Sequence, residues 1–235
     1  MSNFGNAILY KMCADYPHHD DVDVIAGKIW LIGHSYSAAV NRVRNSSLLK
    51  DVENFIADTV APTIKQSNID EWIAKVRAID RLTHDNCEQV LALHKNFTDV
   101  LKQITDLNKR SLASKYLHFH LPNAVFIYDF LANRSITHLN QGKKHDIPQN
   151  YDADYSVFVK RCLVFRDEIF EPKLLGRQST PRELDVYLLK YKKFLDKNSS
   201  GNLELEQWQQ QTIDYIQQNQ SQDAKKNANA LKYDL

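Results

Sequence analysis

The apolar residues of this chain recur every three or four positions, and this spacing constrains the fold more than any other feature. Three series show it: Val22, Ile25, Ile29 and Ile32; Val90, Leu93, Phe97, Val100, Leu101 and Ile104; and Tyr155, Phe158, Cys162, Phe165 and Ile169. Residues spaced in this way lie on one face of an α-helix. Few segments alternate as a half-buried strand would, and glycine and proline number only six each. The sequence therefore predicts an all-α fold.

Helix start signals agree with this pattern. Asn68 precedes an acidic first turn, and Ser179 or Thr180 precedes Pro181, with Glu183 as a capping-box acid. We expect helices near residues 20–44, 47–60, 68–81, 84–104, 111–120, 126–134, 151–170, 180–196 and 203–219. Residues 135–150 predict a long loop, and loops of this length in compact domains are often functional.

The length of 235 residues suits one large domain or two small lobes that share a cleft. We expect residues 1–197 to form a two-lobed helical domain with an interlobe cleft. Residues 198–235 are rich in Gln and Asn and predict a C-terminal helix and tail, in which Trp208, Ile213 and Ile216 could dock one helix.

Several classes of protein are disfavoured by what the sequence lacks. No apolar run approaches the roughly 20 residues of a membrane helix, and the N-terminus does not resemble a signal peptide, so a cytoplasmic protein is expected. Cys13, Cys87 and Cys162 are far apart and form no CxxC motif, which argues against a disulfide framework or a structural zinc site. Phosphate-binding glycine loops are also absent. We expect no metal and no nucleotide cofactor.

The charge is balanced overall but not along the chain. The net charge is +1, yet residues 95–145 contain eight basic side chains and three acidic ones. The basic residues are Lys95, Lys102, Lys109, Arg110, Lys115, Arg134, Lys143 and Lys144, and the acidic ones are Asp99, Asp106 and Asp129. Such a segment is either a site for a polyanion or a solvated face.

The most informative stretch lies within this basic segment, at residues 106–129. Its pattern indicates the end of a helix, a tight polar turn at 106–110 and a short helix from Ser111. A turn at Pro122 follows, and then an apolar run that ends at Asp129. A carboxylate after such a run can lie partly buried, where its environment tunes its charge.

The pattern Ser-Leu-Ala-Ser-Lys-Tyr-Leu-His-Phe-His-x-Pro-x-x-x-x-Ile-Tyr-Asp, residues 111–129, resembles the helix-hairpin-helix DNA glycosylase superfamily, in particular its bacterial 8-oxoguanine DNA glycosylase-like branch. The close match covers about 25 residues, and the helical layout extends it loosely over residues 20–195. In that superfamily a hairpin with two glycines grips DNA phosphates, and an invariant aspartate follows about 18 residues after the lysine of the bifunctional enzymes. Asp129 lies 18 residues after Ser111.

Two positions depart from the family pattern. Leu107 and Lys109 occupy the positions of the hairpin glycines, so Asn108 could supply left-handed backbone and Lys109 and Arg110 could contact phosphate through their side chains. With these residues we place Ser111 and Ser114 in the expected DNA-binding segment. Ser111 stands where the nucleophilic lysine would be, so the resemblance implies a monofunctional enzyme without strand cleavage.

The resemblance also implies the chemistry. The target base of duplex DNA is flipped into a pocket, and a carboxylate stabilises the positive charge that develops on the sugar and orients a water molecule. We expect Asp129 in this role, and Lys115 to hold the base or a phosphate, or to act as a displaced nucleophile. The alternative for Asp129 is a simple helix cap of Phe130–Arg134.

A base pocket could be lined by aromatic and histidine side chains: Trp30, His34, Tyr116, His118 and Tyr128. Two of them have plainer alternatives: Trp30 is better explained as core, and His118 as a core histidine or one that forms hydrogen bonds between helices.

Three functions remain open. The first is a DNA glycosylase that excises an oxidised purine in repair, or a hypermodified base of phage DNA in antiviral defence, and leaves an abasic site. The second is a non-catalytic DNA-binding protein that kept the fold, and the third is an RNA-targeting all-α toxin. In the first, the partner is double-stranded DNA and no cofactor is needed.

Overall fold

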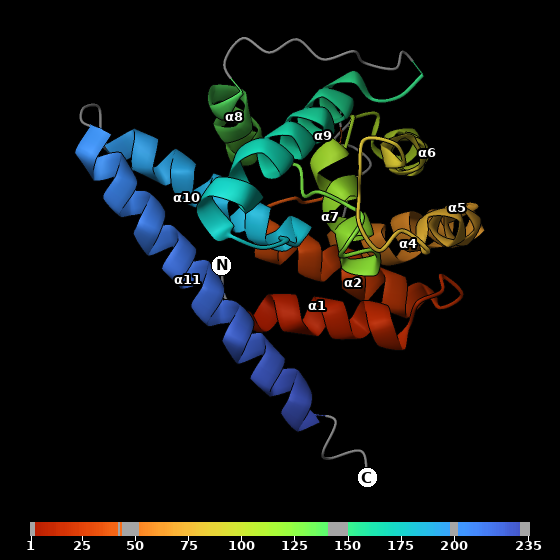
Figure 1. Cartoon of the computed structure of the whole chain (residues 1–235). Helices are drawn as coiled ribbons and strands as arrows, with labels where there is room; N and C mark the ends of the chain where they lie inside the picture. Colours follow the sequence, from red (N-terminus) through yellow and green to blue (C-terminus); the bar gives the residue numbers. More distant parts are fainter. Residues whose placement is uncertain (1–2, 42, 44–51, 141–149, 198–201, 231–235) are drawn as a thin grey trace. The chain divides into compact units, whose positions relative to one another are not determined.

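The computed structural model describes residues 3–41, 43, 52–140, 150–197 and 202–230. These ranges contain helices and no strands, which confirms the all-α prediction (Figure 1). The elements are α1 (Asn3–Asp15), α2 (Val22–Tyr36), α3 (Val52–Phe55), η2 (Ile56–Val60), α4 (Ala61–Gln66), α5 (Ile69–Val76), α6 (Cys87–Thr105), α7 (Arg110–His120), α8 (Phe130–Leu139), α9 (Ala153–Phe165), η3 (Arg166–Leu175), α10 (Pro181–Lys197) and α11 (Asn202–Ala230). The segments η2 and η3 are π-helices. Within the described ranges, no helix is long and apolar enough to cross a membrane.

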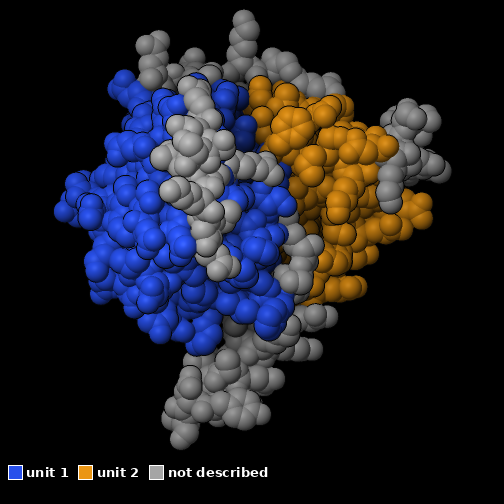
Figure 2. All heavy atoms as spheres, turned by 180° about the vertical axis from the view of Figure 1, so that it is seen from behind, with its two compact units in different colours: residues 1–129, 144–160 blue, residues 130–143, 161–235 orange. Residues whose placement is uncertain are grey.

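The chain divides into two compact units, which Figure 2 colours separately. Unit 1 comprises residues 1–129 and 144–160, and unit 2 comprises residues 130–143 and 161–235. The boundary expected after residue 197 adjoins residues 198–201, which lie outside the described part of the chain.

Unit 1 is built around α7. Residues 112–119 of this helix are all buried, and α1, α2 and α6 pack against it. Helix α1 approaches α2 closely at Gly27, where a Cβ atom would stand 3.3 Å from Cε of Met12. The Tyr36 hydroxyl at the end of α2 donates a hydrogen bond of 2.5 Å to the side-chain oxygen of Asn6. The centre of unit 1 is thus a helix with no solvent-facing side over most of its length.

Unit 2 is organised by α8 packing on α10 and by aromatic side chains. Trp208 of α11 packs against Tyr187, Tyr191 and Phe194 of α10, with ring centroids 5.1–5.5 Å apart. Ile213 and Ile216 are also buried. The expected docking of the C-terminal helix through Trp208, Ile213 and Ile216 is confirmed.

Several expected boundaries were wrong. Helix α1 was not predicted, and the helix expected over 20–44 ends at Tyr36, because Ser37 adopts left-handed backbone with φ 52°. Residues 126–129 have no regular secondary structure and are not the start of the helix expected over 126–134. Residues 135–139, expected in a loop, belong to α8, and residues 141–149 lie outside the described residues.

The start of α10 follows the predicted capping box. The Glu183 N–H donates to Oγ1 of Thr180 (3.2 Å), and the Thr180 N–H donates to the Glu183 carboxylate (2.8 Å). Asn68 lies at the N-cap of α5 but makes no capping bond through its side chain.

Candidate functional site

Helix α6, a short turn and helix α7 follow one another as the sequence predicts. The residue with left-handed backbone in this turn is Asp106 and not Asn108. Asp106 has φ 54° and its N–H donates to the Lys102 carbonyl (2.8 Å). The Leu107 N–H donates to Oγ1 of Thr105 (3.3 Å). The expectation that Asn108 supplies the left-handed residue was wrong, because the sharp change of direction comes directly at the end of α6.

Asn108 and Arg110 are bound by a buried carboxylate of the same unit. The Asp152 carboxylate accepts from Arg110 Nε (2.6 Å), from Asn108 Nδ2 (2.9 Å) and from the Tyr155 N–H (2.9 Å), and Arg110 also pairs with Asp154 at 2.9 Å. Burial alone would raise the pKa of Asp152, but the bonds from Arg110, Tyr155 and Asn108 outweigh it and hold that pKa below its ordinary value. Arg110, one of the two side chains expected to contact DNA phosphate, and Asn108, expected in the DNA-binding turn, thus make internal bonds that fix the turn.

A buried histidine supports the same turn. Nε2 of His94 lies 3.2 Å from the carbonyl oxygen of Arg110, and the imidazole stacks on Tyr155 with ring centroids 3.6 Å apart. Because a carbonyl oxygen only accepts hydrogen bonds, Nε2 carries the proton. Nδ1 is then unprotonated, and its buried lone pair has no hydrogen-bond partner among the described residues. Burial lowers the pKa of His94 to about 4.

Helix α7 is joined to the segment that leads to Asp129. Nζ of Lys115 donates to Oγ of Ser111 (2.7 Å) and to the carbonyl of Tyr128 (3.1 Å). The Ser114 hydroxyl accepts from the Tyr128 N–H (2.9 Å) and lies 3.3 Å from the Tyr128 carbonyl. The structure therefore brings together four of the residues expected in the site and fixes the backbone immediately before Asp129.

Asp129 is partly exposed and stands directly before α8 begins at Phe130. This position agrees with both readings from the sequence, a carboxylate presented at the end of a buried run and a residue that precedes a helix. Its catalytic role stays a prediction.

Lys115 is only 1% exposed, and its amine also lies 5.7 Å from the centroid of the Tyr36 ring. In this position the amine binds Ser111 and Tyr128, so a contact with a phosphate or a flipped base would require it to leave these partners. Lys109 donates to the carbonyl of Ala39 at 3.3 Å.

Two of the side chains expected in a base pocket lie in the core of unit 1. Tyr116 and His118 are 0% exposed. His118 Nδ1 lies 2.8 Å from the Val125 carbonyl, and Nε2 lies 2.6 Å from the Tyr10 hydroxyl. These two contacts correspond to the plainer reading of His118, a histidine that forms hydrogen bonds between elements of the core. Burial raises the pKa of Tyr116 well above its ordinary value.

The other base-pocket candidates are accessible. Trp30 and His34 share one face of α2 and stack with ring centroids 4.2 Å apart. Trp30 is 42% exposed, so its assignment to the core was wrong. Tyr128 is partly exposed, with the Arg110 guanidinium 5.4 Å from its ring centroid.

Unit 1 contains a second buried polar cluster, which was not predicted from the sequence. Lys28 is 0% exposed; its Nζ donates to the Tyr16 carbonyl (2.6 Å) and lies 3.5 Å from Nε2 of His120. His120 stacks on His19, whose Nδ1 is 2.6 Å from the Asp70 carboxylate. Burial lowers the pKa of Lys28 and, more strongly, that of His120. Because these partners are up to 92 residues apart, no spacing in the sequence could reveal them.

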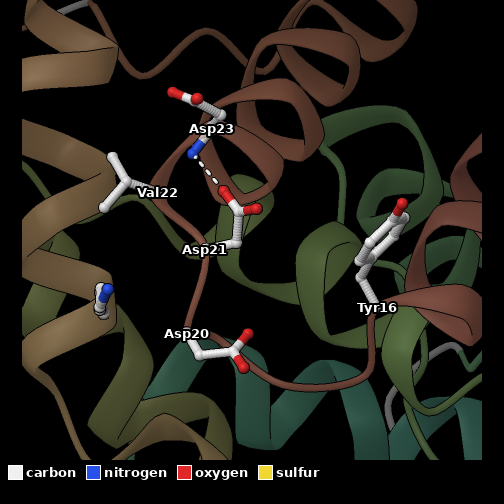
Figure 3. A pocket seen from close by; sticks show the side chains of 6 residues that line it. Tyr16, Asp20, Asp21, Val22 and Asp23 are labelled. Atoms are coloured by element: carbon white, nitrogen blue, oxygen red, sulfur yellow. Dashed lines mark hydrogen bonds between the residues drawn. The ribbon is translucent and has the colours of Figure 1, made fainter.

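A shallow hollow of about 640 Å³ lies on the surface near this cluster, lined by Tyr16, Lys65 and the carboxylates of Asp20, Asp21 and Asp23 (Figure 3). The Asp21 carboxylate accepts from the backbone N–H groups of Asp23 (2.9 Å) and Val24 (3.2 Å) and so caps α2. Three carboxylates disfavour an anionic ligand, so this hollow is not a site for DNA phosphate.

Comparisons with protein-family models, with curated proteins and with solved structures found no match to this chain. What the protein does must therefore be inferred from its own residues.

Proposed function

We propose that the protein is a DNA N-glycosylase that excises a damaged or modified base from duplex DNA, with Asp129 as the catalytic carboxylate. The observation that carries this proposal is the connection of elements around Asp129. Helix α6, a four-residue turn, helix α7, a second turn at 121–124 and a segment without regular secondary structure that ends at Asp129 follow one another, in the order expected of helix-hairpin-helix glycosylases. The contacts of Ser114 and Lys115 with Tyr128 support it, because a catalytic carboxylate must be held in place before the substrate arrives.

The chemistry follows from the charge that develops on the sugar. As the bond between base and sugar breaks, its electron pair leaves with the base, which takes up a proton, and the sugar becomes cationic. The Asp129 carboxylate stabilises this cation and orients the water that adds to the anomeric carbon. On addition the water loses one proton, which balances the proton that the base takes up. The products are the free base and an abasic site.

Lys115 acts here as a positioning residue. Its amine occupies the neighbourhood of Ser111, where bifunctional relatives would carry their nucleophile, but it is buried and bonded to Ser111 and Tyr128. We therefore propose a monofunctional enzyme, in which water rather than an amine attacks the sugar. The enzyme needs neither a metal nor a cofactor for this step.

The substrate is proposed as an oxidised purine such as 8-oxoguanine, or an enlarged modified base of phage DNA in antiviral defence. The test incubates the full chain with duplexes that carry each base and measures abasic sites together with the released base by mass spectrometry. We expect Asp129→Asn to abolish release. The matched control is Asp21→Asn, which also replaces a carboxylate directly before a helix, in this case α2. This variant should release the base as the parent does.

Two outcomes would separate the alternatives. A parent protein that binds DNA in a salt-dependent way but releases no base from any duplex would favour the non-catalytic DNA-binding protein. Borohydride reduction during turnover would trap a covalent adduct if an amine attacked the sugar, so an adduct lost in Lys115→Met would refute the monofunctional mechanism.

A further inference from the structure

Unit 2 contains a pocket that the proposed chemistry does not use. It has a volume of about 300 Å³ and lies among the end of α8, the junction of α9 with η3, and α10. Small-molecule sites typically measure roughly 300–1,000 Å³, so this pocket suits one compact ring system rather than a dinucleotide.

Two polar side chains of the lining, Asn140 and Glu168, provide acceptors. The amide nitrogen of Asn140 donates to the carbonyls of Ile136 (3.1 Å) and Arg161 (3.3 Å). Because carbonyl oxygens only accept hydrogen bonds, these two contacts determine which atom of the Asn140 amide is the nitrogen. The side-chain oxygen of Asn140 is then an acceptor. Glu168 adds a carboxylate to the same lining. The lining therefore favours a ligand that presents N–H donors.

Aromatic and apolar side chains provide the remaining walls. Phe165 and Ile169 come from the junction of α9 and η3, and Tyr191 comes from α10. Tyr191 is held by a hydrogen bond of 2.9 Å between its hydroxyl and Nδ1 of His138. A planar aromatic ring gains most from such walls, because aromatic rings attract one another in offset-stacked or edge-to-face arrangements.

The wall that carries Glu168 has an unusual backbone with a clear cause in the sequence. Pro172 lies inside η3, and a proline ring in an α-helix clashes with the carbonyl four residues earlier, which here belongs to Glu168. The wider π-helix accommodates the ring, and the Gly176 N–H then bonds to the Glu171 carbonyl at 2.8 Å. Segments of π-helix are rare and frequently lie at functional sites.

We propose that this pocket binds one planar heteroaromatic ring of nucleobase size that donates N–H groups to Glu168 and Asn140. The proposal goes beyond the glycosylase function and does not depend on it. The ring is either a free small molecule or an unstacked base of a nucleic acid, since both present the same edge.

Binding to the full chain is measured by calorimetry with 9-methyladenine and with 9-methylpurine, which lacks only the exocyclic amino group. We expect saturable binding of 9-methyladenine at one site and at least tenfold weaker binding of 9-methylpurine. Glu168→Gln should weaken binding about tenfold, and Ile169→Trp should abolish it by filling the pocket. The matched control is Glu206→Gln, an exposed glutamate of α11, which should bind as the parent does.

A second variant tests the backbone. Pro172→Ala removes the ring that would clash with the Glu168 carbonyl in an α-helix, so this segment can adopt α-helix instead of π-helix. The change should weaken 9-methyladenine binding while the far-ultraviolet circular dichroism stays helical. Equal binding of the two methylated probes, or undiminished binding by Ile169→Trp, would overturn the proposal.

A final arm distinguishes the two sources of the ring. Single-stranded oligonucleotides carry either one adenine or an abasic residue at the same position. If the oligonucleotide with adenine binds more tightly than the abasic one, and Ile169→Trp removes this difference, the ligand is a base of a nucleic acid. If 9-methyladenine binds but the two oligonucleotides bind equally, the ligand is a small molecule. Binding of neither probe refutes the proposal. Asp129→Asn should change none of these affinities, so the result is independent of base excision.

Discussion

The buried imidazole of His94 should make the protein sensitive to acid in a way that one substitution isolates. His94 is 0% exposed, its Nε2–H is used by the Arg110 carbonyl (3.2 Å), and a second proton would have to enter on Nδ1. Burial lowers its pKa from the ordinary value of 6.5 to about 4. The unfolded chain therefore takes up this proton first as the pH falls.

The sign and the size follow from linkage between protonation and folding. Between pH 6.5 and pH 4 the unfolded state carries one more proton on this group, so stability present above pH 6.5 is lost as the pH falls towards 4. The pKa difference corresponds to about 3 kcal/mol of unfolding free energy. His94→Gln keeps an amide N–H for the Arg110 carbonyl but cannot bind the proton.

The assay is urea unfolding followed by circular dichroism at pH 7 and at pH 4. His94→Gln should be less stable than the parent at pH 7, and this deficit should shrink by about 3 kcal/mol at pH 4. Other titrating groups are present in both proteins and cancel in the comparison. His34→Gln, which changes an exposed imidazole, controls for the loss of a histidine as such. A deficit for His94→Gln that is the same at both pH values would refute the reasoning.

Further predictions concern the contacts around the turn, the segment before Asp129 and the start of α10. Asp152→Asn removes the buried charge partner of Arg110, whose guanidinium still pairs with the exposed carboxylate of Asp154 at 2.9 Å, and should cost about 1–3 kcal/mol of unfolding free energy; recovery of most of this loss is expected when Arg110 is also replaced by Met, and no recovery would contradict the ion-pair explanation. Lys115→Met should cost about 1–3 kcal/mol and accelerate hydrogen exchange at the Tyr128 amide; unchanged exchange would show that Lys115 does not hold this segment. Thr180→Ala should cost about 1 kcal/mol, measured by thermal unfolding, whereas Thr180→Ser should retain most of the cap; an equal loss in both variants would argue against the capping box.

Periodicity in the sequence was a good guide wherever a helix buries only one face. The series through α6 and α9 and the capping box of α10 predicted these helices because local spacing and local hydrogen bonds determine them. The segment 126–129 was wrongly assigned to a helix, since Phe126 and Ile127 are buried and an apolar run without periodicity is ambiguous. The π-helix η3 was missed because Pro172 was not recognised as a constraint on the turn before it.

The candidate site was predicted less completely than the fold. The proximity of Ser111, Lys115 and Tyr128 follows in part from helical spacing. The burial of Lys115 and the ion pair between Arg110 and Asp152 could not be predicted in this way, because both depend on residues that tertiary packing brings together. Polar side chains such as His118 look like surface groups in a sequence and are satisfied in the core by partners as far as 108 residues away.

The docking of Trp208 has a practical consequence. Its indole ring packs 5.1 Å from Phe194 and 5.4 Å from Tyr187, whereas the Trp30 indole is substantially exposed on α2. Detachment of α11 would transfer one indole from an aromatic environment to water without moving those of the other two tryptophans, Trp30 on α2 and Trp72 on α5. A variant with Trp30 and Trp72 replaced by phenylalanine would therefore give an emission spectrum that reports release of the C-terminal helix separately from melting of the rest.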